Sequence, residues 1–192
     1  MKKLLIAAIT ICMGTTCFGQ SAYSQSDYGQ TEQGNWLVGG SFGFRTNKNN
    51  SSFTLLPNAG YFFANNFAAG ANLTLDFSKN GNINNNDIGF GPFLRYYLGK
   101  TPVRPFLTTS VGYISQSYKT NGTKTTTNGY NFLAGLGYAA FISEDIAIEG
   151  IAAYNYTDFK NASSYNGFSL NFGFQVYLTK SKIEQIKTGT VQ

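Results

Sequence analysis

Three charged residues, Arg95, Arg104 and Glu149, stand in stretches where polar and apolar residues alternate. All three fall on the polar phase of the alternation, that is, on the alternate positions that polar or small residues occupy. Each lies a few residues from a short connection. If the polar phases share one narrow interior, an unpaired charge there is costly and a linked network much less so. We therefore expect these three residues to meet in one polar cluster. Three residues at similar depth would complete its hydrogen bonds: Tyr97, Gln175 and Tyr177.

Five lysines fall in polar connections between the alternating stretches: Lys48, Lys79, Lys119, Lys124 and Lys160. Only Asp87 and Asp158 oppose them there. Two interpretations stay open. The lysines are a solvated surface, or they form a positive rim that binds the phosphates of lipopolysaccharide or of another anionic surface partner, whose identity the sequence does not indicate.

Catalytic patterns are weak in this sequence. The chain contains no histidine, the most common general base. Asp76 and Glu149 are expected near opposite ends of the interior, too far apart to work as a carboxylate pair. The glycines between Gly39 and Gly43 precede no predicted helix and are interpreted as small packing residues, not as a phosphate loop. We expect no enzymatic activity, no cofactor and no metal site.

The elements that must position these residues are strands of period two. In the stretch NFAAGANLTLDFS, residues 66–78, the odd positions are apolar while most even positions are small or polar. Eight such stretches follow one another: 36–45, 53–63, 66–78, 88–98, 103–113, 130–138, 146–157 and 168–178. Their length of about ten residues is that of tilted membrane strands.

The apolar phase is too bulky to face inward. Each stretch carries several large apolar residues, many of them Phe or Tyr, and a small barrel has an interior only just wide enough for ordinary side chains. The other phase, rich in Gly, Ser, Thr and Asn, has the right size for a filled lumen. The sequence therefore predicts an all-β, eight-stranded antiparallel up-and-down barrel whose apolar face, Phe67 to Phe77 included, meets lipid.

Composition agrees with a membrane barrel. Aromatic residues make up 16% of the chain and charged residues only 12%, so the surface does not face water everywhere. Mean hydropathy is nonetheless slightly negative, as alternation predicts. Long polar connections alternate with short ones, which places long extracellular loops at one end and tight periplasmic turns at the other.

Segments outside the barrel have their own signals. Residues 1–19 have two lysines, an apolar run and small residues, which predicts a signal peptide cleaved to leave Gln20 first. Cys12 and Cys17 would leave with it, and neither follows the small residue that a lipoprotein requires. Residues 20–33 are predicted to be a flexible polar leader, 34–178 the barrel and 179–192 a short periplasmic tail. The formal charge then falls from +5 to +3, too weak to indicate nucleic acid.

Two prolines interrupt the predicted strands. Pro57 and Pro92 have no N–H to donate, and a closed barrel offers no free edge on which to place them. Each is expected to mark a bulge or a hydrogen bond missing from the ladder.

The stretches LPNAGYFFANNFAAG and GPFLRYYLG resemble the small outer-membrane β-barrel domain family of Gram-negative bacteria such as the Bacteroidota, similar in architecture to OmpA/OmpX-type barrels. The likeness extends over residues 34–178. It implies an outer-membrane location, contact with outer-membrane lipid and lipopolysaccharide, and insertion by the barrel-assembly machinery. It says little about activity, because fold does not fix function.

Three functions follow as expectations. The first is a non-enzymatic barrel with a structural or surface-interaction role, such as envelope integrity or adhesion through its loops, and a lumen plugged by polar side chains. The second is a narrow, porin-like channel for small solutes. The third, from another class, is a soluble ligand-binding barrel.

Overall fold

The computed structural model describes residues 29–47, 50–80, 83–120, 123–160 and 164–189. The expected signal peptide and residues 20–28 of the expected leader lie outside the described residues. The strands are β1 (Trp36–Asn47), β2 (Asn50–Ala64), β3 (Phe67–Asn80), β4 (Ile83–Tyr97), β5 (Val103–Thr120), β6 (Thr123–Phe141), β7 (Ile146–Phe159) and β8 (Tyr165–Leu178). A 3-10 helix, η2 (Gly29–Thr31), precedes them and α2 (Lys180–Thr188) follows.

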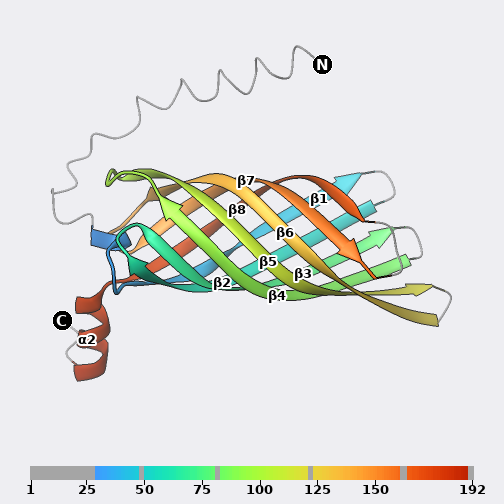
Figure 1. Ribbon diagram of the computed structural model, residues 1–192, viewed down its shortest axis with the longest axis horizontal. Coiled ribbons are helices and arrows are strands. Elements are labelled where there is room, and N and C mark those ends of the chain that lie inside the picture. Colours follow the sequence, from blue (N-terminus) through green and yellow to red (C-terminus); the bar gives the residue numbers. More distant parts are fainter. Residues whose placement is uncertain (1–28, 48–49, 81–82, 121–122, 161–163, 190–192) are drawn as a thin grey trace, which may run out of the picture.

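The eight strands form a closed antiparallel barrel in which each strand pairs with the next and β8 pairs with β1. This confirms the predicted fold. Figure 1 shows η2, α2 and three tight connections at one end, here called the turn end, and four hairpin tips at the other, called the tip end. The turn end contains three short connections, at 65–66, 98–102 and 142–145, in agreement with the predicted alternation of long and short connections.

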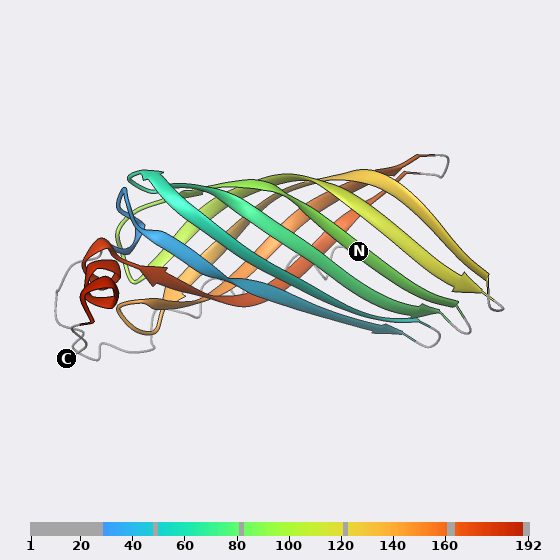
Figure 2. The same ribbon diagram turned by 90° about the horizontal axis from the view of Figure 1, so that it is seen from below.

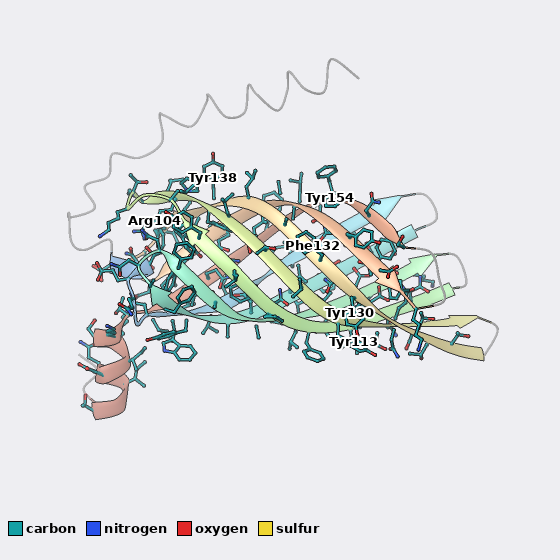
Figure 3. All side chains as sticks on the ribbon, in the orientation of Figure 1. Arg104, Tyr113, Tyr130, Phe132, Tyr138 and Tyr154 are labelled. Atoms are coloured by element: carbon teal, nitrogen blue, oxygen red, sulfur yellow. The ribbon has the colours of Figure 1, made fainter. Side chains whose placement is uncertain are left out.

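The apolar phase of every strand faces outward, as predicted. On β3, Leu73 is 50% exposed, while its neighbour Thr74 lines the interior. Outward aromatic side chains such as Tyr138 and Tyr154 stand away from the wall in Figure 3. This phase therefore supplies the apolar outer surface, while a smaller apolar cluster that includes Leu37, Phe62 and Phe106 is buried inside the barrel toward the turn end.

Outward aromatic residues form two bands. Near the turn end, the ring of Phe67 stacks on Tyr96 with centroids 4.3 Å apart. Toward the tip end, Tyr113 packs edge-on against Tyr130 at 5.8 Å, and Tyr154 packs against Phe168 at 5.5 Å. Aromatic girdles at the two membrane interfaces have this arrangement.

The expected long loops are mostly strand. β5 and β6 continue to Thr120 and from Thr123, through a polar stretch predicted to be a loop, and β3 and β4 likewise extend to Asn80 and from Ile83. These polar tips lack the alternation of apolar and polar residues from which strands are predicted. The β5–β6 tip is rich in Thr, which suits a ladder, and continuing each hairpin pairs the backbone groups.

The two prolines cause no bulge. The β2–β3 register is the same on both sides of Pro57, and the β4–β5 register is the same on both sides of Pro92, although neither proline is paired on that side. Each proline does align with a residue on its other neighbour, Gly40 or Ala71. Of the two expectations, a missing ladder bond is the one observed. The register shift lies instead between Phe62 and Ala64, beside a turn.

The C-terminal helix lies outside the barrel at the turn end. The backbone N–H of Lys180 donates to Asn35 Oδ1 at 3.1 Å, and Lys182 forms an ion pair with Asp145. Within the described ranges, no helix is long and apolar enough to cross a membrane.

Candidate functional site: the floor of the lumen

An ion pair crosses the interior near the turn end. Arg95 on β4 and Glu149 on β7 point inward from strands that are not neighbours, and one guanidinium nitrogen of Arg95 lies 3.0 Å from both carboxylate oxygens. Arg95 is 5% exposed and Glu149 2%. Because both charges are buried, the pair is stable only if its other hydrogen bonds are satisfied.

Two tyrosines supply part of those bonds, while the buried Nε of Arg95 has no hydrogen-bond partner among the described residues. Tyr177 on β8 donates to Glu149 Oε1 at 3.1 Å, and the Tyr97 hydroxyl lies 2.8 Å from that of Tyr177. Arg95 also donates to the Tyr97 hydroxyl at 3.1 Å. The four side chains form a connected network, here called the floor: Arg95, Tyr97, Glu149 and Tyr177. It draws on three strands around the barrel, so it forms only when the barrel closes.

Aromatic rings fill the space around the floor. The ring of Phe106 lies under the Arg95 guanidinium, 4.5 Å from its carbon, in a cation–π contact, and Phe62 packs against Tyr97 at 5.7 Å. Both phenylalanines are almost completely buried. Gly137, the cross-strand neighbour of Phe106 on β6, makes room for that ring: a Cβ there would lie 2.5 Å from it. The floor residues and these rings are therefore buried together at this level of the barrel.

Arg104 has other partners than expected. It is completely buried, as its phase predicted, but its guanidinium reaches the N-terminal segment, where it donates to Thr31 Oγ1 at 2.9 Å and to Gln30 Oε1 at 2.7 Å. Its Nε donates to the Thr101 carbonyl at 2.9 Å. The physical reason is that residues 29–31 fold under the barrel and present oxygen acceptors, whereas the acceptors of Glu149 are occupied by the other floor residues. Figure 3 shows Arg104 at the turn end.

The N-terminal segment is fixed at several points. Asn66, in the left-handed region at φ 67°, donates its N–H to the Thr31 carbonyl at 2.7 Å. The Gly34 N–H donates to the Phe62 carbonyl at 2.8 Å. Gln30 and Thr31 are consequently buried. The polar composition of residues 29–33 predicts a leader, and nothing in the sequence indicates that Gln30 and Thr31 are buried beneath the barrel.

Gln175 lies at the expected depth and is 1% exposed, but its Oε1 has no hydrogen-bond partner among the described residues. Tyr97 and Tyr177 take the structural role that the sequence predicted for all three. Among the described residues, no three His, Cys, Asp or Glu side chains gather as metal ligands.

Above the floor, the lumen is a polar cavity of about 930 Å³. Its lower boundary contains Phe93 and Arg95, and its walls carry mainly hydroxyl and amide side chains. Asp76 and Asp87 line it toward the tip end as cross-strand neighbours. Thr54 hydrogen-bonds to Asp76, and Gln116 donates to Asp87 Oδ2 at 3.1 Å.

The lysines lie toward the tip end. Lys79 and Lys160 are exposed there, on β3 and just beyond β7. Lys119 and Lys124 are aligned with each other in the β5–β6 ladder. Lys48 lies outside the described residues.

Comparisons with known proteins identify a family and solved structures that share this architecture. Residues 10–179 match the family described as outer membrane protein beta-barrel domain. Among solved structures, the chain is similar to Neisserial surface protein A, with a TM-score of 0.55 and 17% identity over 74% of this chain and 93% of that one. It is also similar to a major outer membrane protein of Thermus thermophilus, with a TM-score of 0.51 and 9% identity over 75% of this chain and 98% of that one.

A search of curated proteins finds no match. At these identities the solved structures support the fold alone, while the family match covers most of the chain. The chain therefore belongs to the outer membrane protein β-barrel domain family and is a protein of the bacterial outer membrane.

Proposed function

We propose that this barrel has a non-enzymatic structural or surface-interaction role and that its lumen is closed at the turn end, which faces the periplasm. The observation that carries the proposal is the floor. The cavity ends at Arg95, and beneath it the buried side chains of Tyr97, Glu149 and Tyr177 are linked across the interior. To pass, a solute would have to separate a buried ion pair.

The alternatives have less support. A narrow channel requires a continuous polar path, whereas aromatic rings and the floor fill the turn end and residues 29–31 pack beneath it. A soluble ligand-binding barrel disagrees with the outer-membrane family and with the apolar outer wall.

Liposome swelling tests the proposal. Vesicles containing the purified full chain are diluted into isosmotic glycine, arabinose or sucrose, and swelling is compared with that of protein-free vesicles. We expect no increase above the protein-free rate for any of the three solutes. Size-dependent swelling, fastest with glycine, would contradict a closed lumen and support the channel.

We also propose that the barrel-assembly machinery inserts the barrel. For the lysines at the tip end, the proposed partner is lipopolysaccharide. Exposed Lys79 and Lys160 support phosphate contacts at the tip end. Adding lipopolysaccharide to the refolded barrel is expected to raise its melting temperature, and Lys79→Gln with Lys160→Gln to reduce that rise. Lys182→Gln at the turn end is the matched control. An equal reduction in the control would contradict a rim that binds phosphates.

A further inference from the structure

The wall of the barrel opens between its first and last strands. β1 and β8 are paired from Trp36 opposite Leu178 to Phe42 opposite Phe172. Beyond that point, among the described residues, Gly43–Asn47 pair with β2 alone and Tyr165–Asn171 with β7 alone. Figure 2 shows the β1–β2 tip and the orange β7–β8 tip well apart from each other. The strands on either side continue, so the separation is a gap in the wall.

The cavity of the lumen reaches through this gap. Its lining elsewhere consists almost entirely of inward-facing residues, as in a closed wall. At β1 and β8 it also includes outward-facing residues, Phe44, Phe168 and Leu170, together with inward-facing Ser169 and Asn171. The space inside the barrel is therefore continuous with the apolar outer surface on this side.

The surroundings of the gap are apolar. Phe44 is 72% exposed and Phe168 82%, and both stand on the face that meets lipid. Open strand edges with unpaired N–H and C=O groups are not stable against hydrocarbon, and they persist at membrane depth only beside a polar or water-filled space. A molecule that lies across this gap must be polar on the lumen side and apolar on the outer side.

Two acidic residues inside the barrel indicate the charge of the polar part of that molecule. Thr54 is aligned with Gly43, the first β1 residue without a β8 partner, and Asp76 is the next residue in the same row, about 10 Å from Gly43 at ordinary strand spacing. Asp87 follows Asp76. Asp87 is 8% exposed, lines the cavity, and its Oδ1 has no hydrogen-bond partner among the described residues. Two neighbouring carboxylates with an unused acceptor favour a cationic hydrogen-bond donor.

We propose that the gap between β1 and β8 is a lateral binding site for an amphiphile of the outer leaflet whose head group carries a primary amine. The amine binds at Asp76 and Asp87, and the acyl chain leaves the lumen on the tip side of Gly43 and Asn171, which still lie against each other, and lies along Phe44, Phe168 and Leu170. With the floor closed beneath it, the cavity is a blind vestibule that is loaded from the side.

Native mass spectrometry of the full chain in dodecyl maltoside tests the head-group preference. The probes are lysophosphatidylethanolamine and lysophosphatidylglycerol with the same acyl chain. We expect the amine lipid to be retained about tenfold more strongly, the size of one charge-assisted hydrogen bond. Asp87→Asn should abolish that preference, while Asp158→Asn, an exposed outward carboxylate on β7, should leave it unchanged. Equal retention of the two lipids by the wild type, or an equal loss in both variants, would overturn the proposal.

The lateral position is tested with a lysophosphatidylethanolamine that carries a diazirine on its acyl chain. After irradiation, cross-links should concentrate on residues 43–44 and 168–171, with few at Leu107, an equally lipid-facing residue of β5. An even spread over all strands would overturn the lateral route. Heat-modifiable gel mobility confirms that each variant is folded, and Asp76→Asn replaces Asp87→Asn if the latter is not. Neither readout depends on whether the floor conducts.

Discussion

Arg95 and Glu149 meet across the interior of the barrel, on strands that are separated by two others around the wall. Their contact is therefore a property of the closed barrel and not of any single hairpin. It joins β4 to β7 at the level where Tyr97 and Tyr177 complete the floor. The pair should for this reason report on both the stability of the barrel and the closure of its lumen.

Removing one partner of the pair should destabilise the barrel. Glu149→Ala leaves the Arg95 guanidinium buried without its carboxylate, which we expect to lower the free energy of unfolding by about 3–5 kcal/mol. Urea unfolding in lipid vesicles measures this. Glu144→Ala, an exposed carboxylate in the neighbouring turn, is the control and should change stability by less than about 0.5 kcal/mol. A Glu149→Ala barrel as stable as the wild type would show that water solvates the pair.

Because side chains on β3 point alternately outward and inward, an Arg substitution should have different effects on stability at two adjacent residues. Leu73→Arg places a charge on the lipid-facing wall and should cost about 2–4 kcal/mol near the bilayer midplane. Thr74→Arg places the same charge in the polar cavity, where we expect a cost of less than about 1 kcal/mol. Both are measured by unfolding in vesicles. Equal costs at the two positions would contradict the assignment of the faces.

Arg104 should hold the N-terminal segment beneath the barrel. Arg104→Gln removes the charged donors to Gln30 and Thr31. Because a hydrogen bond from a charged group contributes about 1.5–3 kcal/mol, amide exchange at Gly34 and Asn66 should accelerate about 10- to 100-fold. Exchange in the central ladder, at Leu73 for example, should change little. Unchanged exchange at Gly34 would show that Arg104 does not hold the segment.

Maturation is predicted from the sequence alone. Cleavage after Gly19 should make Gln20 the first residue, since Cys17 and Gly19 are the well-placed small residues after the apolar run. The intact mass of protein extracted from membranes measures this. A mass that includes Cys12 would contradict the prediction.

The fold and the main pair of the site could be predicted because each depends on a repeated local pattern. Alternation assigns the inward phase, and counting residues from the short turns places Arg95 and Glu149 at one height. The partners of Arg104 could not be predicted in this way, because Gln30 and Thr31 lie in a polar segment whose folding depends on the finished barrel.

The gap in the wall is also invisible in the sequence. β1 and β8 keep their alternation where they separate, since Phe44 and Phe168 still face outward and Ser169 still faces inward. Pairing between the first and last strands is set by the closure of the whole barrel and not by any neighbouring turn. The sequence pattern does not extend to the tips of β5 and β6 for a simpler reason: these strand ends carry mostly polar residues at both odd and even positions and so show no apolar alternation.

Conductance in a planar bilayer tests the closed floor most directly. The wild type should give no steady open current at any voltage that the bilayer tolerates, because the linked side chains of Arg95, Glu149 and Tyr177 span the lumen. Glu149→Ala should give intermittent openings, since it removes the carboxylate that holds the network together. A wild-type barrel with a steady, sizeable conductance, equal to that of Glu149→Ala, would contradict the closed floor and identify the protein as a channel.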